Sequence, residues 1–318
     1  MLARPRVLLP LTGLLVAGSL AMTSCASSGG SSGASASPPG ASTNIASASE
    51  TPTSIAATTT TTASSGGGSA ASLVPASIKS KGTITFAMDA SYPPDEMVKS
   101  DGHTLEGFDV DLANAIAGQL GLKAQTQNVT FDNIIPGVQS GKYDVGMSSF
   151  TDTKEREAVV DFVDYFQAGE GYYVKAGSSK KFNGLQSLCN ATVSVETGTT
   201  EESDAKAQAK KCKVNVLSFS DQNQANLAVS SGRADVGFAD SQVAAYIVKQ
   251  SNGQFQNTGT AFEVAPYGIA TAKGNGMDKA IQAAVNALIA NGQYTKILSK
   301  WGVQAGAVKS ATLNGATS

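Results

Sequence analysis

Histidine and cysteine are almost absent from this sequence, whose 318 residues include one histidine and three cysteines. The usual zinc sites and the histidine-based catalytic triads need several such side chains. The single histidine, His103, lies in the turn-like stretch SDGHTLEG, where a solvated side chain is the simpler interpretation. The sequence also lacks a Walker-type or GxGxxG phosphate-binding motif. We therefore predict a protein without a metal or cofactor, and one that is not an enzyme.

An excess of positive charge is also missing. The chain has 23 lysine and arginine residues against 25 aspartate and glutamate residues, which gives a formal net charge of −2. Proteins that bind nucleic acid usually gather basic side chains on one face to contact phosphates. This balance therefore predicts no nucleic-acid partner.

The first 24 residues have the pattern of a secretory signal, because Arg4 and Arg6 precede an apolar run from Val7 to Met22. The run is too short, and wrongly flanked, for a membrane span. The sequence MTSC at 22–25 resembles a bacterial lipobox, in which the cysteine is lipidated, although Met22 stands where such boxes usually have leucine. We predict a lipidated Cys25 and a location on the outer face of the cell membrane. Plain secretion with a free thiol is the alternative.

Residues 26–72 consist mostly of small and polar residues, with Glu50 as their one charge. Such a segment buries too little apolar surface to offset its ordering entropy. We therefore predict a disordered tether over residues 25–75, and a second disordered segment, a tail, over residues 307–318.

Two cysteines remain for the folded part, Cys189 and Cys212. In an exported protein, two such thiols indicate one disulfide. The stretches 191–195 and 213–219 have the pattern of strands, with a helix between them. Both strands of such a βαβ unit begin at the same edge of a sheet, so each cysteine precedes a neighbouring strand start. We predict the disulfide, and two buried free thiols are the alternative.

Strand and helix patterns alternate along the folded part. A strand pattern at 83–89 is followed by GFDVDLANAIAGQLG, which places Phe108, Leu112, Ile116 and Leu120 on one face of a helix. A short helix at 132–141 and a strand at 143–147 follow, and a second such set occupies residues 190–250. This alternation predicts an α/β fold with mostly parallel sheets.

An octet occurs twice in this alternation. Residues 140–147 read SGKYDVGM and residues 231–238 read SGRADVGF, each after a helix pattern. We interpret the two octets as corresponding parts of two similar α/β lobes. Ligands gather at the carboxyl ends of strands in α/β sheets. If the lobes face each other, Ser149 and Asp240 look into a shared cleft.

Arg156, in the stretch SSFTDTKER, is the first candidate for a binding residue. The spacing of Asp152 and Glu155 resembles a capping box, which predicts a helix that begins near Thr153. The helix dipole disfavours a cation in the first turn, whereas the planar guanidinium suits a carboxylate. Position alone leaves a surface charge and an anion clamp as equal alternatives.

The stretch VETGTTEES predicts an anion site of backbone N–H groups, because Thr199 and Glu202 have the spacing of a helix cap. Asp240 follows the second octet and either binds an ammonium group or caps the next helix. Tyr92, beside two prolines, and Phe131 are candidate pocket walls, although core packing explains Phe131 at least as well.

Together these stretches resemble the family 3 extracellular solute-binding proteins, the amino-acid receptors of ABC importers. The motifs that carry the resemblance are GFDVDLANAIAGQLG, FDNIIPGVQSGKYDVG, TDTKER, VETGTT, GRADVGFAD and ANGQYTKILSKWG. The resemblance implies two α/β lobes joined by a two-stranded hinge, as in type II periplasmic binding proteins. We expect lobe 1 at 76–172 and 268–306, lobe 2 at 173–267, and hinge crossings near 168–175 and 264–270.

The resemblance also implies roles for individual residues. Arg156 would bind the α-carboxylate of the ligand, with the backbone N–H groups of Thr151 and Thr200. The α-ammonium would contact Asp240, the Thr151 hydroxyl and the Ser149 carbonyl. Tyr92 and Phe131 would flank the ligand side chain, and Asp89 and Glu196 would face its tip. Ser148, at a strand end, and Thr199, at a helix start, complete the expected ligand-binding residues.

The sequence departs from the family at two of these places. Asp95 stands where an aromatic residue often follows YPP, and Glu196 replaces the basic residue of some glutamine-binding members. These departures weaken a glutamine assignment, and the added carboxylates favour a basic or amide side chain. We expect a monomeric binding protein, tethered by its lipid anchor, that delivers an amino acid to an ABC permease. The alternatives are a periplasmic-type dehydratase that uses Glu196, and a sensor that reports to a membrane kinase.

Overall fold

The structure is a computed structural model that describes residues 69–317. The predicted signal at 1–24, the lipidation of Cys25 and most of the predicted tether lie outside the described residues. Within the described part of the chain, no helix has the length and apolar character needed to cross a membrane.

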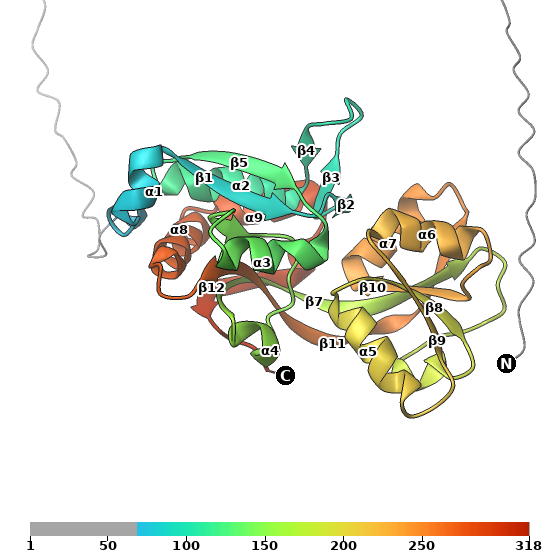
Figure 1. The fold of residues 1–318 in the computed structure, drawn as a ribbon. Helices are drawn as coiled ribbons and strands as arrows, with labels where there is room; N and C mark the ends of the chain where they lie inside the picture. Colours follow the sequence, from blue (N-terminus) through green and yellow to red (C-terminus); the bar gives the residue numbers. More distant parts are fainter. Residues whose placement is uncertain (1–68, 318) are drawn as a thin grey trace, which may run out of the picture. The chain divides into compact units, whose positions relative to one another are not determined.

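One sheet of nine strands organises the described residues (Figure 1). Eight of its strands follow each other in the order β5 (Lys123–Asn128), β1 (Thr83–Met88), β6 (Val145–Gly146), β11 (Phe255–Ala272), β7 (Val160–Lys175), β10 (Val236–Asp240), β8 (Thr192–Glu196) and β9 (Asn215–Phe219). The strands β5, β1 and β6 are parallel to each other, and so are β10, β8 and β9. We call the part around the first group lobe 1 and the part around the second group lobe 2.

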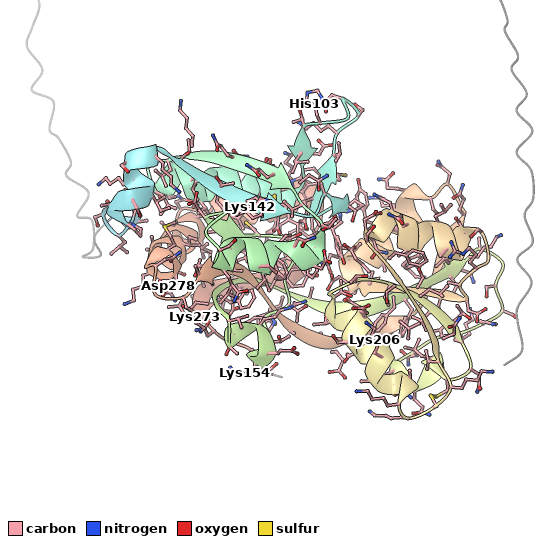
Figure 2. All side chains as sticks on the ribbon, viewed as in Figure 1. His103, Lys142, Lys154, Lys206, Lys273 and Asp278 are labelled. Carbon is pink, nitrogen blue, oxygen red and sulfur yellow. A yellow bond between two sulfur atoms is a disulfide. The ribbon has the colours of Figure 1, made fainter. Side chains whose placement is uncertain are left out.

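The helices divide between the two lobes. Lobe 1 has α1 (Ala76–Lys81), α2 (Phe108–Gln119), α3 (Ile134–Gln139), α4 (Lys154–Glu157), α8 (Met277–Ala290) and α9 (Gln293–Trp301). Lobe 2 has α5 (Thr200–Ala209), α6 (Gln222–Ser230) and α7 (Ser241–Gln250). A small second sheet, in lobe 1, consists of β2 (Ser91–Tyr92), β3 (Glu96–Val98) and β4 (Leu105–Glu106). His103 lies in the exposed turn between β3 and β4 (Figure 2).

The strands β7 and β11 connect the lobes. They are antiparallel partners from the Lys175–Phe255 pair in lobe 2 to the Val160–Ala272 pair in lobe 1. Their register shifts twice between Thr258 and Ala265, so the ladder is interrupted where the chain passes from one lobe to the other. The fold predicted from the sequence, two α/β lobes with a two-stranded hinge, is confirmed. The lobe boundaries remain a prediction, because both long strands belong to both lobes.

Each lobe has its own apolar core. In lobe 1 the predicted face of α2 is buried, since Phe108, Leu112, Ile116 and Leu120 are all at most 2% exposed. The helix begins after Gly107 and ends at Gln119. Gly121 follows it with a φ of 70°, a conformation that favours glycine. This packing fixes the first turn of α2, where the buried carboxylate of Asp109 points toward the site described below.

The two octets have the same structural role. In the first, Asp144 accepts a hydrogen bond of 2.9 Å from the backbone N–H of Thr85, at the start of β1. In the second, Asp235 accepts one of 2.9 Å from the backbone N–H of Thr192, at the start of β8. Each aspartate therefore fastens its octet to the neighbouring strand, and the octets occupy corresponding places in the two lobes.

The predicted disulfide between Cys189 and Cys212 is present. Cys189 follows the short 3-10 helix η3 (Leu185–Leu188) and Cys212 follows α5. The bond closes the βαβ unit at the edge where β8 and β9 begin.

Both predicted disordered segments need a correction within the described residues. Residues 70–72 form the 3-10 helix η1 (Ala70–Ser72), and Ala70 and Val74 pack into the lobe 1 core. At the other end, η4 (Gln304–Gly306) leads into β12 (Ala307–Leu313), which pairs with β7. The hydroxyl of Thr312 and the N–H of Gly315 donate to Asp164. The tail is thus ordered, because β12 pairs with β7 and the residues at its end donate to Oδ2 of the buried Asp164.

Candidate ligand-binding site

Four candidate residues lie at the carboxyl ends of parallel strands, two from each lobe. Asp89 directly follows β1 and Ser148 follows β6, whereas Glu196 ends β8 and Asp240 ends β10. The sequence argument placed them there because strand ends of an α/β sheet meet at one edge. All four side chains are at most 7% exposed.

Arg156 reaches across the cleft between the lobes. Its Nη1 donates to the carbonyl of Thr151 at 2.6 Å, and its Nη2 donates to the carbonyl of Gly198 in lobe 2 at 2.9 Å. A guanidinium group has five N–H donors, so three remain for an anion. Burial lowers the pKa of Arg156, while Glu201 and Asp240 act in the opposite direction. Arginine stays charged in proteins, and this one is therefore a fixed cation in the cleft.

The helix that carries Arg156 begins as predicted, but with a different cap. The Thr153 hydroxyl, not Asp152, accepts the hydrogen bond of 3.2 Å from the backbone N–H of Arg156. Asp152 is fully buried instead, beside Asp164, and burial raises its pKa to about 8. The capping-box interpretation of Asp152 and Glu155 was therefore wrong, because the aspartate points into the lobe.

A row of aromatic rings forms one wall of the site. Tyr92 stacks on Phe131 with ring centroids 6.0 Å apart, and Phe131 stacks on Phe150 at 4.3 Å. The guanidinium of Arg156 lies over both phenylalanine rings, 5.5 Å and 5.3 Å from their centroids. Phe131 also belongs to the lobe 1 core, so the pocket and core interpretations of this residue both hold. Tyr92 packs into the apolar cluster of lobe 2, which shows that the lobes are in contact.

The turn after β6 is held in an unusual conformation. Ser149 has a φ of 52°, in the left-handed region that non-glycine residues rarely adopt. Its N–H donates to Asp109 at 3.2 Å and its hydroxyl donates to Asp95 at 2.8 Å. Such strain persists only where the surroundings fix it, and it is typical of functional sites. The buried acids behind the turn therefore position the Ser149 carbonyl, and they leave its hydroxyl engaged.

The hydroxyl groups of Ser148 and Thr199 are also engaged. The Ser148 hydroxyl donates to Glu96 at 2.7 Å and accepts from the Asp89 N–H at 2.8 Å. The Thr199 hydroxyl donates to the Glu196 carbonyl at 2.8 Å and accepts from the Glu202 N–H at 3.1 Å. Thr199 is thus the predicted cap of α5, and both residues contribute to the site by positioning its backbone.

Gly198 brings α5 close to lobe 1. Its φ of 87° favours glycine, and a Cβ there would lie 3.2 Å from the Cβ of Asp132. Beside it, the hydroxyl groups of Thr151 and Thr200 lie 3.4 Å apart, one from each lobe. The first turn of α5 therefore points its backbone N–H groups at the space next to Arg156, which suits an anion.

Asp240 occupies the position before α7, but its side chain makes no capping hydrogen bond. The carboxylate is thus not used as a helix cap, which was the alternative that the sequence left open. Burial raises the pKa of Asp240 well above its ordinary value, and Glu201 adds to the shift. A buried carboxylate of this kind favours a neighbouring cation.

Asp89 and Glu196 face each other where β1 and β8 end. Asp89 accepts hydrogen bonds from the Ser91 N–H and hydroxyl, and from the Phe131 N–H at 3.0 Å. Glu196 is 1% exposed, and within the described residues neither of its side-chain oxygens has a hydrogen-bond partner. Burial raises the pKa of Glu196 to about 11, and the charge of Asp89 adds to the shift. Two buried carboxyl groups so placed repel each other when both are ionised, and the pair therefore favours a proton or a cation beside it.

A cavity of about 780 Å³ adjoins Arg156, Asp240, Thr151 and Thr200. Within residues 69–317, no cluster of three or more histidine, cysteine, aspartate or glutamate side chains could hold a metal ion. The arrangement instead offers a cation and N–H groups for one end of a zwitterion, a carboxylate for its other charge, and two further carboxyl groups beyond an aromatic wall.

Sequence reasoning missed four residues near this site. Phe150 lies in SSFTDTKER and was an available aromatic candidate. Glu170 and Gln242 could not be found from the sequence. The strand register brings Glu170 near the site, and the contact between the lobes brings Gln242 there. Glu201 lies next to Thr200 and is 2% exposed, although its position in a helix start is typical of a solvated charge.

Comparisons with known proteins show the family to which the chain is similar. Residues 84–304 match the profile of the bacterial extracellular solute-binding proteins, family 3. The arginine-binding protein ArgT of Corynebacterium glutamicum is 32% identical over 250 residues, which are 76% of this chain and 82% of that protein. The ABC transporter glutamine-binding protein GlnH of Bacillus subtilis is 32% identical over 232 residues, which are 71% of this chain and 83% of that protein.

Solved structures are similar as well. An ancestral arginine-binding protein bound to arginine superposes with a TM-score of 0.66 at 38% identity, and the match covers 69% of this chain and 98% of that one. The ancestral amino acid-binding protein AncCDT-1, a precursor of cyclohexadienyl dehydratase, superposes with a TM-score of 0.65 at 35% identity, and the match covers 71% of this chain and 97% of that one.

Proposed function

Because the chain belongs to the bacterial extracellular solute-binding proteins of family 3, we propose that it is the extracytoplasmic binding component of an ABC importer for a cationic amino acid. Arginine is the first candidate. The protein acts as a monomer, held at the membrane by a lipid on Cys25, and it passes its ligand to a membrane permease. It is a binding protein and not an enzyme.

The amino-acid backbone of the ligand binds between Arg156 and Asp240. Arg156 has N–H donors left after its bonds to Thr151 and Gly198, and its planar fork matches the two oxygens of a carboxylate. The N–H groups of the first turn of α5 lie beside it. The α-ammonium contacts the Asp240 carboxylate and the Ser149 carbonyl. Ser148 and Thr199 position these groups rather than touch the ligand through their hydroxyls.

The observation that carries the choice of ligand is Glu196, whose two buried oxygens lack a partner in the described residues. A guanidinium group between Glu196 and Asp89 would satisfy both carboxylates with charge-assisted hydrogen bonds. An amide side chain supplies only two N–H donors and no charge, and its oxygen would face the carboxylates. The names of several similar proteins, which include arginine-binding ones, support the same choice.

The test is calorimetric titration with arginine and with citrulline, which has nearly the same shape but no charge. Charge-assisted hydrogen bonds contribute about 1.5–3 kcal/mol each, so arginine binds at least about tenfold more tightly than citrulline. The affinities of lysine and ornithine lie between those of arginine and citrulline, because an ammonium point charge replaces the planar guanidinium group. If citrulline or glutamine binds more tightly than arginine, the proposed ligand is wrong.

One observation favours a dehydratase as the second candidate. The raised pKa of Glu196, about 11, would let it donate a proton to a substrate. The charges near the site argue against this activity, however. A prephenate-like acid would place additional negative charge beside the carboxyl groups of Asp89 and Asp240, and like charges in a buried site repel. Incubation with such an acid, followed by analysis of the products, separates the two functions.

A further inference from the structure

Asp240 has a second carboxylate directly beside it. In the ladder between β10 and β7, Asp240 is paired with Glu170. Side chains of directly opposed residues in an antiparallel pair lie on the same face of the sheet, close together, and like charges there are destabilising. The register therefore places two acids where the α-ammonium of one ligand needs only one.

Glu170 is buried but not satisfied. It is 5% exposed, and within the described residues its Oε2 has no hydrogen-bond partner. Burial raises the pKa of Glu170 to about 11, with further contributions from Glu201 and Asp204. Buried polar atoms are nearly always paired in folded proteins, so an unpaired carboxyl oxygen in a cavity wall marks a place for a donor.

This wall belongs to the cavity of about 780 Å³ that begins at Arg156 and Asp240. Glu170, Asp204 and Glu263 also line it, from β7, α5 and β11, and Glu263 is exposed. Asp89, Tyr92 and Glu196 lie outside the cavity lining. The cavity therefore includes carboxyl groups that the proposed place of the ligand side chain, at Asp89 and Glu196, does not use.

The lysines labelled on the neighbouring helices have other partners (Figure 2). Lys154, on α4, lies 2.9 Å from Glu157, and Lys206, on α5, lies 2.6 Å from Glu202. The described residues also contain no cluster suited to a metal ion. An ammonium group with three N–H donors fits these carboxyl groups, and ligand pockets of this volume hold molecules larger than one amino acid.

We infer that Glu170, with Asp204 and Glu263, forms a second ammonium subsite that binds an alkylammonium group other than the α-ammonium of a bound amino acid. The inference rests on the proposed function, because it takes Arg156 and Asp240 as the place of the ligand backbone. The ammonium group has two possible sources. One is the N-terminus of a dipeptide, whose amide nitrogen replaces the α-ammonium at Asp240. The other is a small amine that binds beside a free amino acid.

Two ligands of similar length separate charge from size. Glycylarginine carries an ammonium group in this cavity, and N-acetylarginine carries an uncharged extension in the same place. Calorimetry with the wild-type protein gives glycylarginine an affinity at least about tenfold higher than N-acetylarginine. In Glu170→Gln this ratio falls to within about twofold, while the Kd for free arginine changes less than about threefold. Asp278, on α8 (Figure 2), provides the control. Asp278→Asn also removes a carboxylate, but it changes neither the affinity ratio nor the Kd for free arginine.

The second arm titrates ethylammonium into the arginine-saturated protein. Saturable binding that Glu170→Gln abolishes identifies a separate amine as the source. The inference is overturned if glycylarginine has no advantage over N-acetylarginine and ethylammonium does not bind saturably, or if Glu170→Gln leaves every ammonium effect intact. Failure of free arginine to bind would instead overturn the proposed function, so the two failures are distinguishable.

Discussion

The guanidinium of Arg156, in lobe 1, donates a hydrogen bond of 2.9 Å to the carbonyl oxygen of Gly198, in lobe 2. The same group donates to the Thr151 carbonyl in its own lobe. One side chain therefore links both lobes and also faces the space that we propose for the ligand carboxylate. In this proposal, lobe contact and ligand recognition depend on the same planar fork.

Arg156→Lys tests this dependence, because lysine keeps the charge but not the fork. We expect arginine to bind about 2–3 kcal/mol more weakly, and Arg156→Ala to cost about 2–5 kcal/mol, since it removes one partner of a buried charge pair. Calorimetric titration measures both losses. Lys154→Ala is the matched control from the same helix turn, where the pair of the exposed Lys154 with Glu157 contributes about 1 kcal/mol. An Arg156→Lys variant with unchanged affinity would show that the fork does not hold the ligand.

Glu196→Gln tests the tip of the site. The pKa of Glu196 is about 11, so this group is protonated at neutral pH before a ligand binds. A guanidinium group stabilises the ionised form, and binding therefore releases about one proton at pH 7. We expect arginine to bind about tenfold more tightly for each pH unit between pH 6 and 8. In Glu196→Gln this pH dependence disappears, and arginine loses its advantage over citrulline. Titrations in two buffers of different ionisation enthalpy count the protons.

The strand ends were predictable, because alternating patterns define β1, β6, β8 and β10 and an α/β sheet collects their carboxyl ends at one edge. Strand patterns alone placed Ser149 and Asp240 at a shared cleft, and the family resemblance placed Asp89 and Glu196 together at the tip of the ligand. The direction of a side chain at such an end was less predictable. Ser148 and Thr199 have the sequence environment of ligand contacts, yet their hydroxyls bond to neighbouring backbone and acidic groups.

Residues that depend on register or on lobe contact could not be found from the sequence. Glu170 lies in β7 among mostly buried residues, and only the pairing with Asp240 brings it to the wall of the cavity. The strand β12 was missed for a related reason. Its residues Ala307–Leu313 include few apolar side chains, and they are ordered by pairing with β7 and by hydrogen bonds to Asp164. Pairing of this kind leaves little trace in composition.

The stability of the ligand-free protein falls as pH rises from about 5 to 8. Burial raises the pKa of Asp95 to about 8 and that of Glu196 to about 11, from unfolded values of about 4. Between those limits the native state binds more protons than the unfolded state, so the free energy of unfolding decreases with pH. Each such group contributes a slope of about 1.4 kcal/mol per pH unit. Chemical denaturation at several pH values measures the slope. In Glu196→Gln the slope is smaller by the contribution of one group, about 1.4 kcal/mol per pH unit. A stability that rises over this range would contradict the assignment.

The disulfide stabilises lobe 2 by closing a loop, because Cys189 and Cys212 have a sequence separation of 23. The loop-entropy relation gives about 3 kcal/mol for a loop of this length. We expect the double variant with serine at both positions to unfold about 3 kcal/mol more easily and to bind arginine with little change. Denaturation of the variant and of the oxidised wild-type protein, each followed by circular dichroism, measures the difference. A loss below about 0.5 kcal/mol would show that the loop is already constrained without the bond.

Gln242 is a second residue that joins the lobes. Its Nε2, on α7, donates to Asp95 of lobe 1 at 2.8 Å and to the Tyr267 hydroxyl at 2.6 Å. Asp95 is fully buried, and its second oxygen has no partner in the described residues, so loss of Gln242 leaves this carboxyl still less satisfied. We expect Gln242→Leu to weaken arginine binding about tenfold, because it destabilises the closed arrangement by roughly one hydrogen bond to a buried acid. Small-angle scattering with saturating arginine reports whether the lobes still close. Asp95→Asn and the double variant complete a mutant cycle, and additive losses in affinity would show that the two side chains do not act together.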